Sequence, residues 1–82
     1  MEVDMNWYNV QYADANGMVS QWTQAGTHLE AAGNVLLDRG FNGIHDAAPT
    51  TPIMVVRKHD YIAGSYTLRE VEHEANRIVG LV

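Results

Sequence analysis

The stretch YADANGMVSQW, residues 12–22, decides the fold because it holds a turn between two segments with strand character. The turn is Asp14-Ala15-Asn16-Gly17, whose residue types favour a tight reversal of the chain. Residues 5–14 and 18–25 flank it, and both alternate with a period of two and contain aromatic or β-branched residues, as strands do. The sequence therefore predicts a β-hairpin, and the turn decides which side chains face the core.

Two registers are open to this hairpin. A two-residue turn at Asn16-Gly17 would pair Ala15 with Met18. A three-residue loop ending in a glycine bulge would instead pair Asp14 with Met18, and burial favours it because it separates apolar from amide side chains. Its apolar face would hold Tyr8, Val10, Tyr12, Met18 and Trp22. Its polar face would hold Trp7, Asn9, Gln11, Gln21 and Thr23.

Two later segments are typical of capped amphipathic helices. Thr27 and Glu30 form a capping box for the first, and Gly40 suits the left-handed residue after its end, which predicts a helix over about 27–39. Thr67 and Glu70 form a second capping box. The apolar residues of this second helix follow a 3-4-3-4 spacing and are Leu68, Val71, Ala75, Ile78 and Val82. Such a narrow seam can pack on a sheet or pair with a second copy of itself.

The region between the helices predicts a loop and one strand. Residues 42–52 have no period and contain two prolines, so we expect either a plain surface crossing or a functional loop. Residues 52–62 begin with an apolar run, which indicates a strand that is central in the sheet or covered on both faces, and Gly64 and Ser65 then break the pattern. The expected fold is one α+β domain over residues 1–82: hairpin, helix, strand, helix, with a three-stranded antiparallel sheet and two helices packed on it.

Composition excludes several classes of function. The chain has 82 residues, a net charge of −5 and only five Lys and Arg residues, so direct nucleic-acid binding is disfavoured. It has no cysteine, which excludes disulfides and thiol chemistry. No apolar run approaches the roughly 20 residues of a membrane span, and the first ten residues contain no base, unlike a signal peptide. We therefore expect a cytoplasmic protein with no membrane contact.

No set of residues has the spacing of a catalytic or metal site. The four histidines (His28, His45, His59 and His73) lack ligand spacing. Glu70 and His73 match a di-iron motif that needs four helices, and neither serine lies in a nucleophile elbow. We expect no metal, no cofactor and no enzymatic activity in the single chain. A metal or catalytic site would have to be built at an interface between several copies.

The remaining candidates for a function are aromatic and amide side chains on the surface, which are suited to protein binding. The candidate partner-binding residues are Trp7, Asn9, Gln11, Gln21, Tyr61 and Tyr66. The first 41 residues hold five acids and one base, so they would attract a partner protein with a basic surface. The alternative is a structural subunit without enzymatic activity that self-associates as a homodimer or larger homo-oligomer, through the C-terminal seam or a hairpin edge.

The order of elements resembles that of compact α+β accessory proteins of phages and mobile elements, some of which inhibit host defence. The resemblance is one of architecture and no motif carries it. It implies an inhibitor or adaptor that works by binding another protein.

Overall fold

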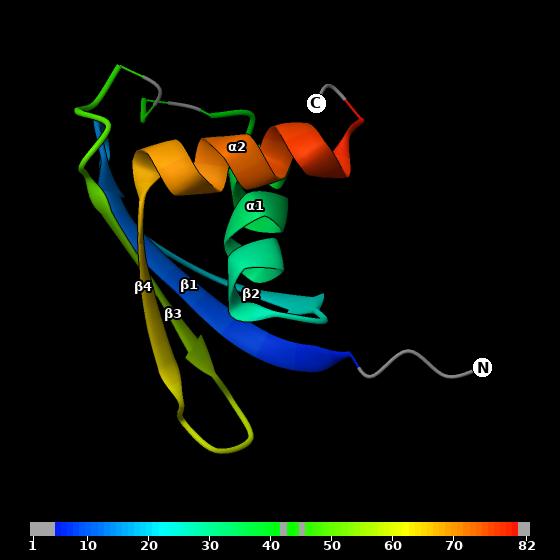
Figure 1. Ribbon diagram of the computed structural model, residues 1–82. Helices are drawn as coiled ribbons and strands as arrows, with labels where there is room; N and C mark the ends of the chain where they lie inside the picture. Colours follow the sequence, from blue (N-terminus) through cyan, green and yellow to red (C-terminus); the bar gives the residue numbers. More distant parts are fainter. Residues whose placement is uncertain (1–4, 42, 45, 81–82) are drawn as a thin grey trace.

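The computed structural model describes residues 5–41, 43–44 and 46–80, which form a sheet covered on one face by two helices (Figure 1). The elements in chain order are β1 (Asn6–Asp14), β2 (Gly17–Ala25), α1 (His28–Asp38), β3 (Pro52–Arg57), β4 (Ala63–Thr67) and α2 (Leu68–Ile78). The strand order is β2-β1-β3-β4, and each neighbouring pair is antiparallel. The predicted α+β class, with two helices and an antiparallel sheet, is confirmed.

The prediction of three strands is wrong, because the segment after Gly64 forms β4 at the edge of the sheet. By residue type alone, Gly64 is expected to end a strand. A Cβ atom at this position would lie 3.4 Å from the Cβ of His28 and 3.1 Å from the ring of Tyr66. The glycine therefore accommodates a crowded contact with the start of α1 inside a strand, which is a known use of glycine in sheets.

The hairpin adopts neither of the two expected registers. Asp14 pairs with Gly17, and the turn residues are Ala15 and Asn16. Two details of the expected turn chemistry are present: the Asp14 carboxylate accepts a hydrogen bond from the Asn16 amide at 2.7 Å, and Gly17 has a φ of 119°. Gly17 is nevertheless the first residue of β2 rather than a bulge residue, so the predicted bulged register is wrong.

This register reverses the predicted faces of β2. Val19 lies opposite Tyr12 in the core, whereas Trp22, expected in the core, is 51% exposed. Gln21 lies opposite Val10 on the helix side, where its amide donates to Asp38 at 2.7 Å. The side chains of the hairpin alone do not determine this face, because the group that satisfies the Gln21 amide lies at the end of α1.

The core lies between the sheet and the helices. Its fully buried members come from both layers and from the loop before β3: Tyr8, Val10, Val35, Leu36, Ile44, Ile53, Val55, Leu68 and Val71. β3 is central in the sheet, as expected. It is not covered on both faces, because Met54 on the other face is 47% exposed.

The ends of α1 agree with the sequence. The Thr27 hydroxyl accepts from the Glu30 amide at 3.1 Å. At the other end Gly40 has a φ of 65°, its amide donates to the Leu37 carbonyl, and the Phe41 amide donates to the Leu36 carbonyl. This pair of bonds satisfies carbonyls that a helix end leaves free. The predicted first helix is therefore confirmed.

The apolar seam of α2 packs inside the molecule. Thr67 and Glu70 form a complete capping box. At Gly33 of α1 a Cβ atom would lie 2.9 Å from the end of Ile78 and 3.4 Å from the Ala75 backbone, so the two helices meet closely there. The seam position Val82 lies outside the described residues. The contact with α1 occupies the face that could otherwise pair with a second copy.

The loop before β3 is tied to the rest of the fold. Ile44 is fully buried, and the carbonyl of Gly43 accepts from the Ala15 amide in the hairpin turn. The carbonyls of Thr51 and Pro49 accept from the first amides of α2. The described part of the loop therefore packs as a structural crossing, and Asn42 and His45 lie outside the described residues.

Candidate functional site

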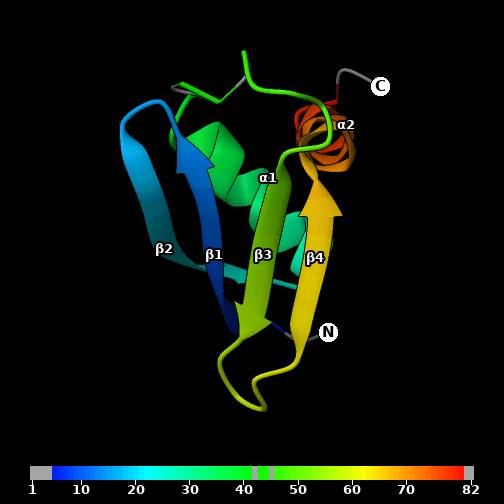
Figure 2. The ribbon, with the colours of Figure 1, turned by 90° about the vertical axis from the view of Figure 1, so that its left-hand side faces the viewer.

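The face of the sheet opposite the helices, called the outer face below, is open toward the viewer in Figure 2. It receives alternate residues of all four strands. From β1 and β2 these are Trp7, Asn9, Gln11, Ala13, Met18, Ser20, Trp22 and Gln24. From β3 and β4 they are Pro52, Met54, Val56, Ala63 and Ser65. Large apolar side chains therefore lie on a face that neither helix covers.

The two tryptophans are the largest of these side chains. Trp7 is 48% exposed and Trp22 is 51% exposed. Trp22 pairs with Asn9 and Trp7 pairs with Gln24, so the two indoles are diagonal neighbours across β1 and β2. The ammonium group of Lys58 lies 5.9 Å from the centre of the Trp22 ring, within the range of a cation–π contact. Two indoles and one cation thus share this part of the outer face.

An amide cluster lies beside the tryptophans. Asn9 is only 7% exposed although it is on the outer face. Its amide nitrogen lies 3.1 Å from the Ser20 hydroxyl, and its carbonyl oxygen accepts from the Gln11 amide at 2.5 Å. Asn9 is therefore held in place, while Gln11 and Ser20 remain exposed beside it.

Two open hollows lie at the ends of this surface. One, of about 470 Å³, is lined by Met5, Asn6, Trp7, Lys58 and His59. The other, of about 240 Å³, lies between Met18 of β2 and Met54 of β3. These hollows can receive protruding side chains of a partner, because apolar groups line much of each.

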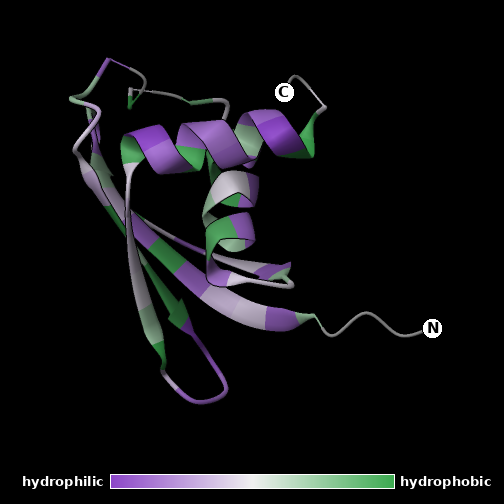
Figure 3. Cartoon of the chain, in the orientation of Figure 1, coloured by the Kyte–Doolittle hydropathy of each residue, from purple (hydrophilic) through white to green (hydrophobic). Residues whose placement is uncertain are grey.

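The charge of the outer face differs from that of the whole chain. None of the described side chains on this face is acidic, and Lys58 is the charged group at its border. The acids concentrate on the helical layer, where α2 alone contributes Glu70, Glu72 and Glu74. Figure 3 shows this helix as largely hydrophilic on its outward side. A surface of apolar and amide side chains without acids, with Lys58 at its border, therefore coexists with a net charge of −5.

Three of the six predicted partner-binding residues lie together. Trp7, Asn9 and Gln11 follow one another along the outer face of β1. The other three lie elsewhere. Gln21 is on the helix side, Tyr61 is 78% exposed in the turn after β3, and Tyr66 packs against the core. Burial raises the pKa of the Tyr66 hydroxyl, which is typical of a structural tyrosine.

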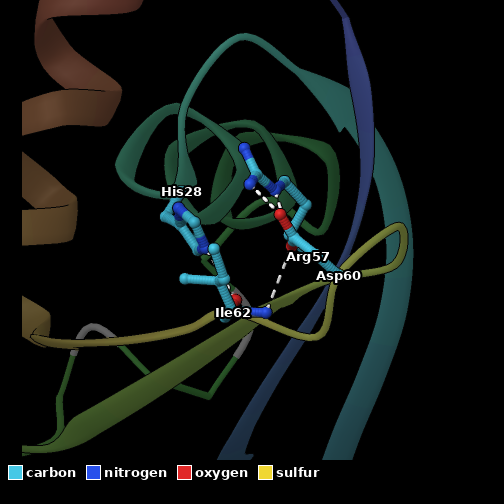
Figure 4. Close-up of polar contacts among 4 residues, drawn as sticks. All are labelled: His28, Arg57, Asp60 and Ile62. Atoms are coloured by element: carbon cyan, nitrogen blue, oxygen red, sulfur yellow. Dashed lines mark hydrogen bonds and ion pairs between the residues drawn. The ribbon is translucent and has the colours of Figure 1, made fainter.

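A second polar cluster joins the turn between β3 and β4 to the start of α1 (Figure 4). Arg57 forms an ion pair with Asp60, and the Asp60 carboxylate also accepts from the Ile62 amide at 3.3 Å. The Ile62 carbonyl lies 2.8 Å from Nε2 of His28, which must carry the proton because a carbonyl only accepts. These contacts fix the turn against the start of α1.

The ion pair of this turn keeps both of its charges at neutral pH. The hydrogen bond from Arg57 lowers the pKa of Asp60 from its usual 3.8 to about 2. A similar pair occurs on α2, where Arg77 holds both carboxylate oxygens of Glu74 at 2.7 Å and lowers the pKa of Glu74. Both carboxylates are engaged by arginine, so neither has the raised pKa of a general acid.

The described residues hold no group of three metal-ligating side chains. Three of the four histidines lie in different parts of the fold: His28 begins α1, His59 lies in the turn after β3, and His73 lies on α2. Between residues 5 and 80, apart from the two positions not described, no helix is long and apolar enough to cross a membrane.

Sequence reasoning missed Trp22, Met18 and Met54 as surface residues. The bulged register places Trp22 and Met18 in the core, and the apolar run of residues 53–56 does not indicate which face of the strand is exposed. Alternation along β3 separates Met54 from Ile53 and Val55, but no local signal identifies Trp22 and Met18 as surface residues. No protein-family model matches the chain, and no curated protein or solved structure is significantly similar to it.

Proposed function

We propose that the chain is a non-catalytic protein-binding module and that the outer face is its binding surface. The observation that carries the proposal is the exposure of about half of each indole, at Trp7 and Trp22, on neighbouring strands of an uncovered face. Tryptophan is the residue type most enriched at the energetic centres of protein interfaces. The rigid sheet beneath both indoles keeps the ordering cost of binding low.

The surface chemistry suits a partner that presents apolar side chains. Met18 and Met54 add adaptable apolar area around one hollow, while Gln11 and Gln24 offer hydrogen bonds around the indoles. The acids of the helical layer lie away from the outer face, so they would favour the approach of a partner with a basic surface through the net charge of the chain and not by direct contact. A module of this kind can serve as an inhibitor or an adaptor, because it acts by occupying a surface of another protein.

The test is affinity purification from the cells that encode the chain, with three forms of the bait. The wild type is compared with a Trp7→Ala, Trp22→Ala double variant and with Tyr61→Ala. Tyr61 is the matched control because it is an even more exposed aromatic side chain that lies beyond the sheet. We expect one protein to be enriched by the wild type and by Tyr61→Ala and lost with the double variant.

Circular dichroism on each variant checks that it is folded before the comparison is made. Equal recovery of the same proteins by all three forms would contradict the proposal, and so would the absence of any enriched protein. Loss of the partner with Tyr61→Ala but not with the double variant would move the site to the turn after β3.

A further inference from the structure

The free edge of β2 is open to pairing with another strand. β2 is an edge strand of nine residues, whereas the opposite edge strand, β4, has five. Proteins usually protect edges with charged residues, prolines or short strands, because unpaired backbone groups attract other strands. β2, with the sequence GMVSQWTQA, contains neither a charged residue nor a proline. The long edge therefore lacks these protections.

The backbone direction along β2 follows from two hydrogen bonds. The Lys58 amide donates to the Trp7 carbonyl at 2.8 Å, so the backbone of Trp7 faces β3 and that of Tyr8 faces β2. Thr23, the partner of Tyr8, therefore faces β1, and its neighbour Gln24 faces outward. The Gln24 carbonyl accepts from the Asn34 side chain at 3.5 Å, which agrees with this direction.

The same alternation assigns the outward backbone groups of the rest of the strand. Met18, Ser20 and Trp22 share the direction of Gln24, so their N–H and C=O groups lie along the open edge. Among the described residues, Asn34 of α1 contacts the outward backbone of this strand at Gln24. The part that is available for pairing is therefore centred on Ser20.

We propose that a second copy of this chain pairs with the edge in antiparallel orientation, with the two-fold axis at Ser20. Each Ser20 then faces its counterpart, and the two residues exchange both N–H···O=C bonds. Met18 of each copy faces Trp22 of the other, with the same exchange of bonds. The two sheets become one continuous sheet, and the interface uses the same patch of both copies, as a two-fold dimer requires.

The side chains favour this occupant. Met18 is 74% exposed and Trp22 is 51% exposed in the single chain, and both lie on the outer face. The two-fold pairing brings a methionine sulfur beside an indole twice, and sulfur–aromatic contacts are favourable. The edge is thus complementary to itself in its side chains as well as in its backbone.

The charge distribution also favours a second copy of this chain at the edge of β2. Two copies with a net charge of −5 repel each other, so a surface without like charges is one on which they meet at low electrostatic cost. β2 contributes no charge, and the nearby end of α1 contributes Asp38 and Arg39, one of each sign, both beside Gln21. A dimer through α2 would instead bring its glutamates together.

The proposal goes beyond protein binding by the outer face and does not depend on it. Pairing at β2 would place the Trp22 side chains of both copies beside the junction, while each Trp7 stays on the outer face of its own copy. The dimer would therefore present two copies of the amide and indole surface side by side. A partner that repeats its own binding segment would gain affinity from the second site.

A single introduced cysteine tests the contact directly, because the chain contains no cysteine. Ser20→Cys is compared with Ser65→Cys, which places the same change on the outer face of the opposite edge strand. Facing residues of a hydrogen-bonded antiparallel pair have Cα atoms about 5.5 Å apart and Cβ atoms about 5–5.5 Å apart. This Cβ separation is longer than the roughly 3.5–4.5 Å of a disulfide, but a short bismaleimide reagent spans it. With such a reagent we expect Ser20→Cys to form covalent dimers about tenfold faster than Ser65→Cys, because its two cysteines face each other.

Analytical ultracentrifugation tests the dimer without a cross-link. An interface of this size is small, so we expect a dimer of twice 9.1 kDa to form between about 10 µM and about 1 mM protein. Ser20→Pro removes an N–H that points away from the sheet and should prevent pairing, whereas Ser20→Ala keeps that N–H and should dimerise. Trp7→Ala should dimerise like the wild type, which separates this test from that of the proposed function.

Three results would overturn the proposal. The first is a wild type that stays monomeric at about 1 mM, where even weak pairs associate. The second is equal cross-linking of Ser20→Cys and Ser65→Cys, which would indicate random collision. The third is a dimer that forms equally with folded Ser20→Pro. If Ser20→Pro does not fold, the cysteine comparison alone decides the matter.

Discussion

The two faces of the sheet use the same strands in opposite ways. On the helix side Tyr8, Val10 and Ile53 are at most 1% exposed. On the outer face Trp7, Trp22 and Met54 are each about half exposed. Stability therefore comes mainly from the buried face, because burial of apolar area is the dominant favourable contribution to folding. The outer face carries large side chains that the core does not need, so they can be explained by binding.

The sharpest test of this comparison uses two neighbours in β3. Ile53 is fully buried and Met54 is 47% exposed. We expect Ile53→Ala to lower the free energy of unfolding by about 2–5 kcal/mol through lost burial and a cavity. Met54→Ala, the matched change on the outer face, should change it by less than about 1 kcal/mol. Urea denaturation measures both, and similar losses would mean that something in the folded chain covers the outer face.

The next largest effect concerns the layer that covers the buried face. A Cβ atom at Gly33 would lie 2.9 Å from the Ile78 side chain and 3.1 Å from that of Glu74. Gly33→Val should therefore force α1 and α2 apart and cost about 1–3 kcal/mol by overpacking. Both tryptophans lie on the outer face, so the fluorescence of the folded variant should match that of the wild type. A shifted emission maximum would show that the two faces are coupled.

A smaller effect is expected for the tryptophans themselves. Because each indole is half exposed, Trp7→Thr and Trp22→Thr should each change the free energy of unfolding by less than about 1 kcal/mol. Acrylamide should quench the remaining tryptophan in either variant before unfolding. A loss of more than about 2 kcal/mol with Trp22→Thr alone would instead point to a buried Trp22 and to the bulged hairpin register.

The smallest effect is at the border of the two faces, in the turn after β3. The pKa of Asp60 is lowered to about 2 by Arg57, so its ionised form stabilises the folded chain above pH 4, and this contribution is lost as the pH falls toward 2. Asp60→Asn should therefore be less stable than the wild type at pH 7, with a difference that shrinks between pH 4 and pH 2. Glu72→Gln on α2 is the control. A difference that is unchanged at pH 2 would show that the charge of Asp60 is not its cause.

The elements with strong local signals could be predicted from the sequence. Thr27, Thr67 and Gly40 mark three helix ends because a cap depends on residues within a few positions of it. β4 could not be predicted in the same way. Gly64 has the composition of a break, and its use in a strand depends on the approach of His28, which is distant in the sequence.

The site could be predicted only in part, because local patterns do not contain contacts between residues that are distant in the sequence. Trp7, Asn9 and Gln11 belong to a strand whose alternation is unambiguous, and they do share the outer face. Gln21 and Trp22 belong to β2, whose alternation allows either face to be buried. In the structure the buried face of β2 carries Val19 and Ala25, and Gln21 on the same side reaches Asp38 on α1; local patterns do not contain these contacts. The assignment of Trp22 therefore needed the tertiary structure.

The central position of β1 has a consequence for how the chain folds. β1 pairs with β2 through a short turn, but its other neighbour, β3, begins at Pro52, after α1 and a loop. Closing so long a segment costs entropy before the contacts between β1 and β3 compensate for it. We expect the hairpin and α1 to gain structure early and the docking of β3 to limit the folding rate. During synthesis, β1 would have one unpaired edge until β3 leaves the ribosome.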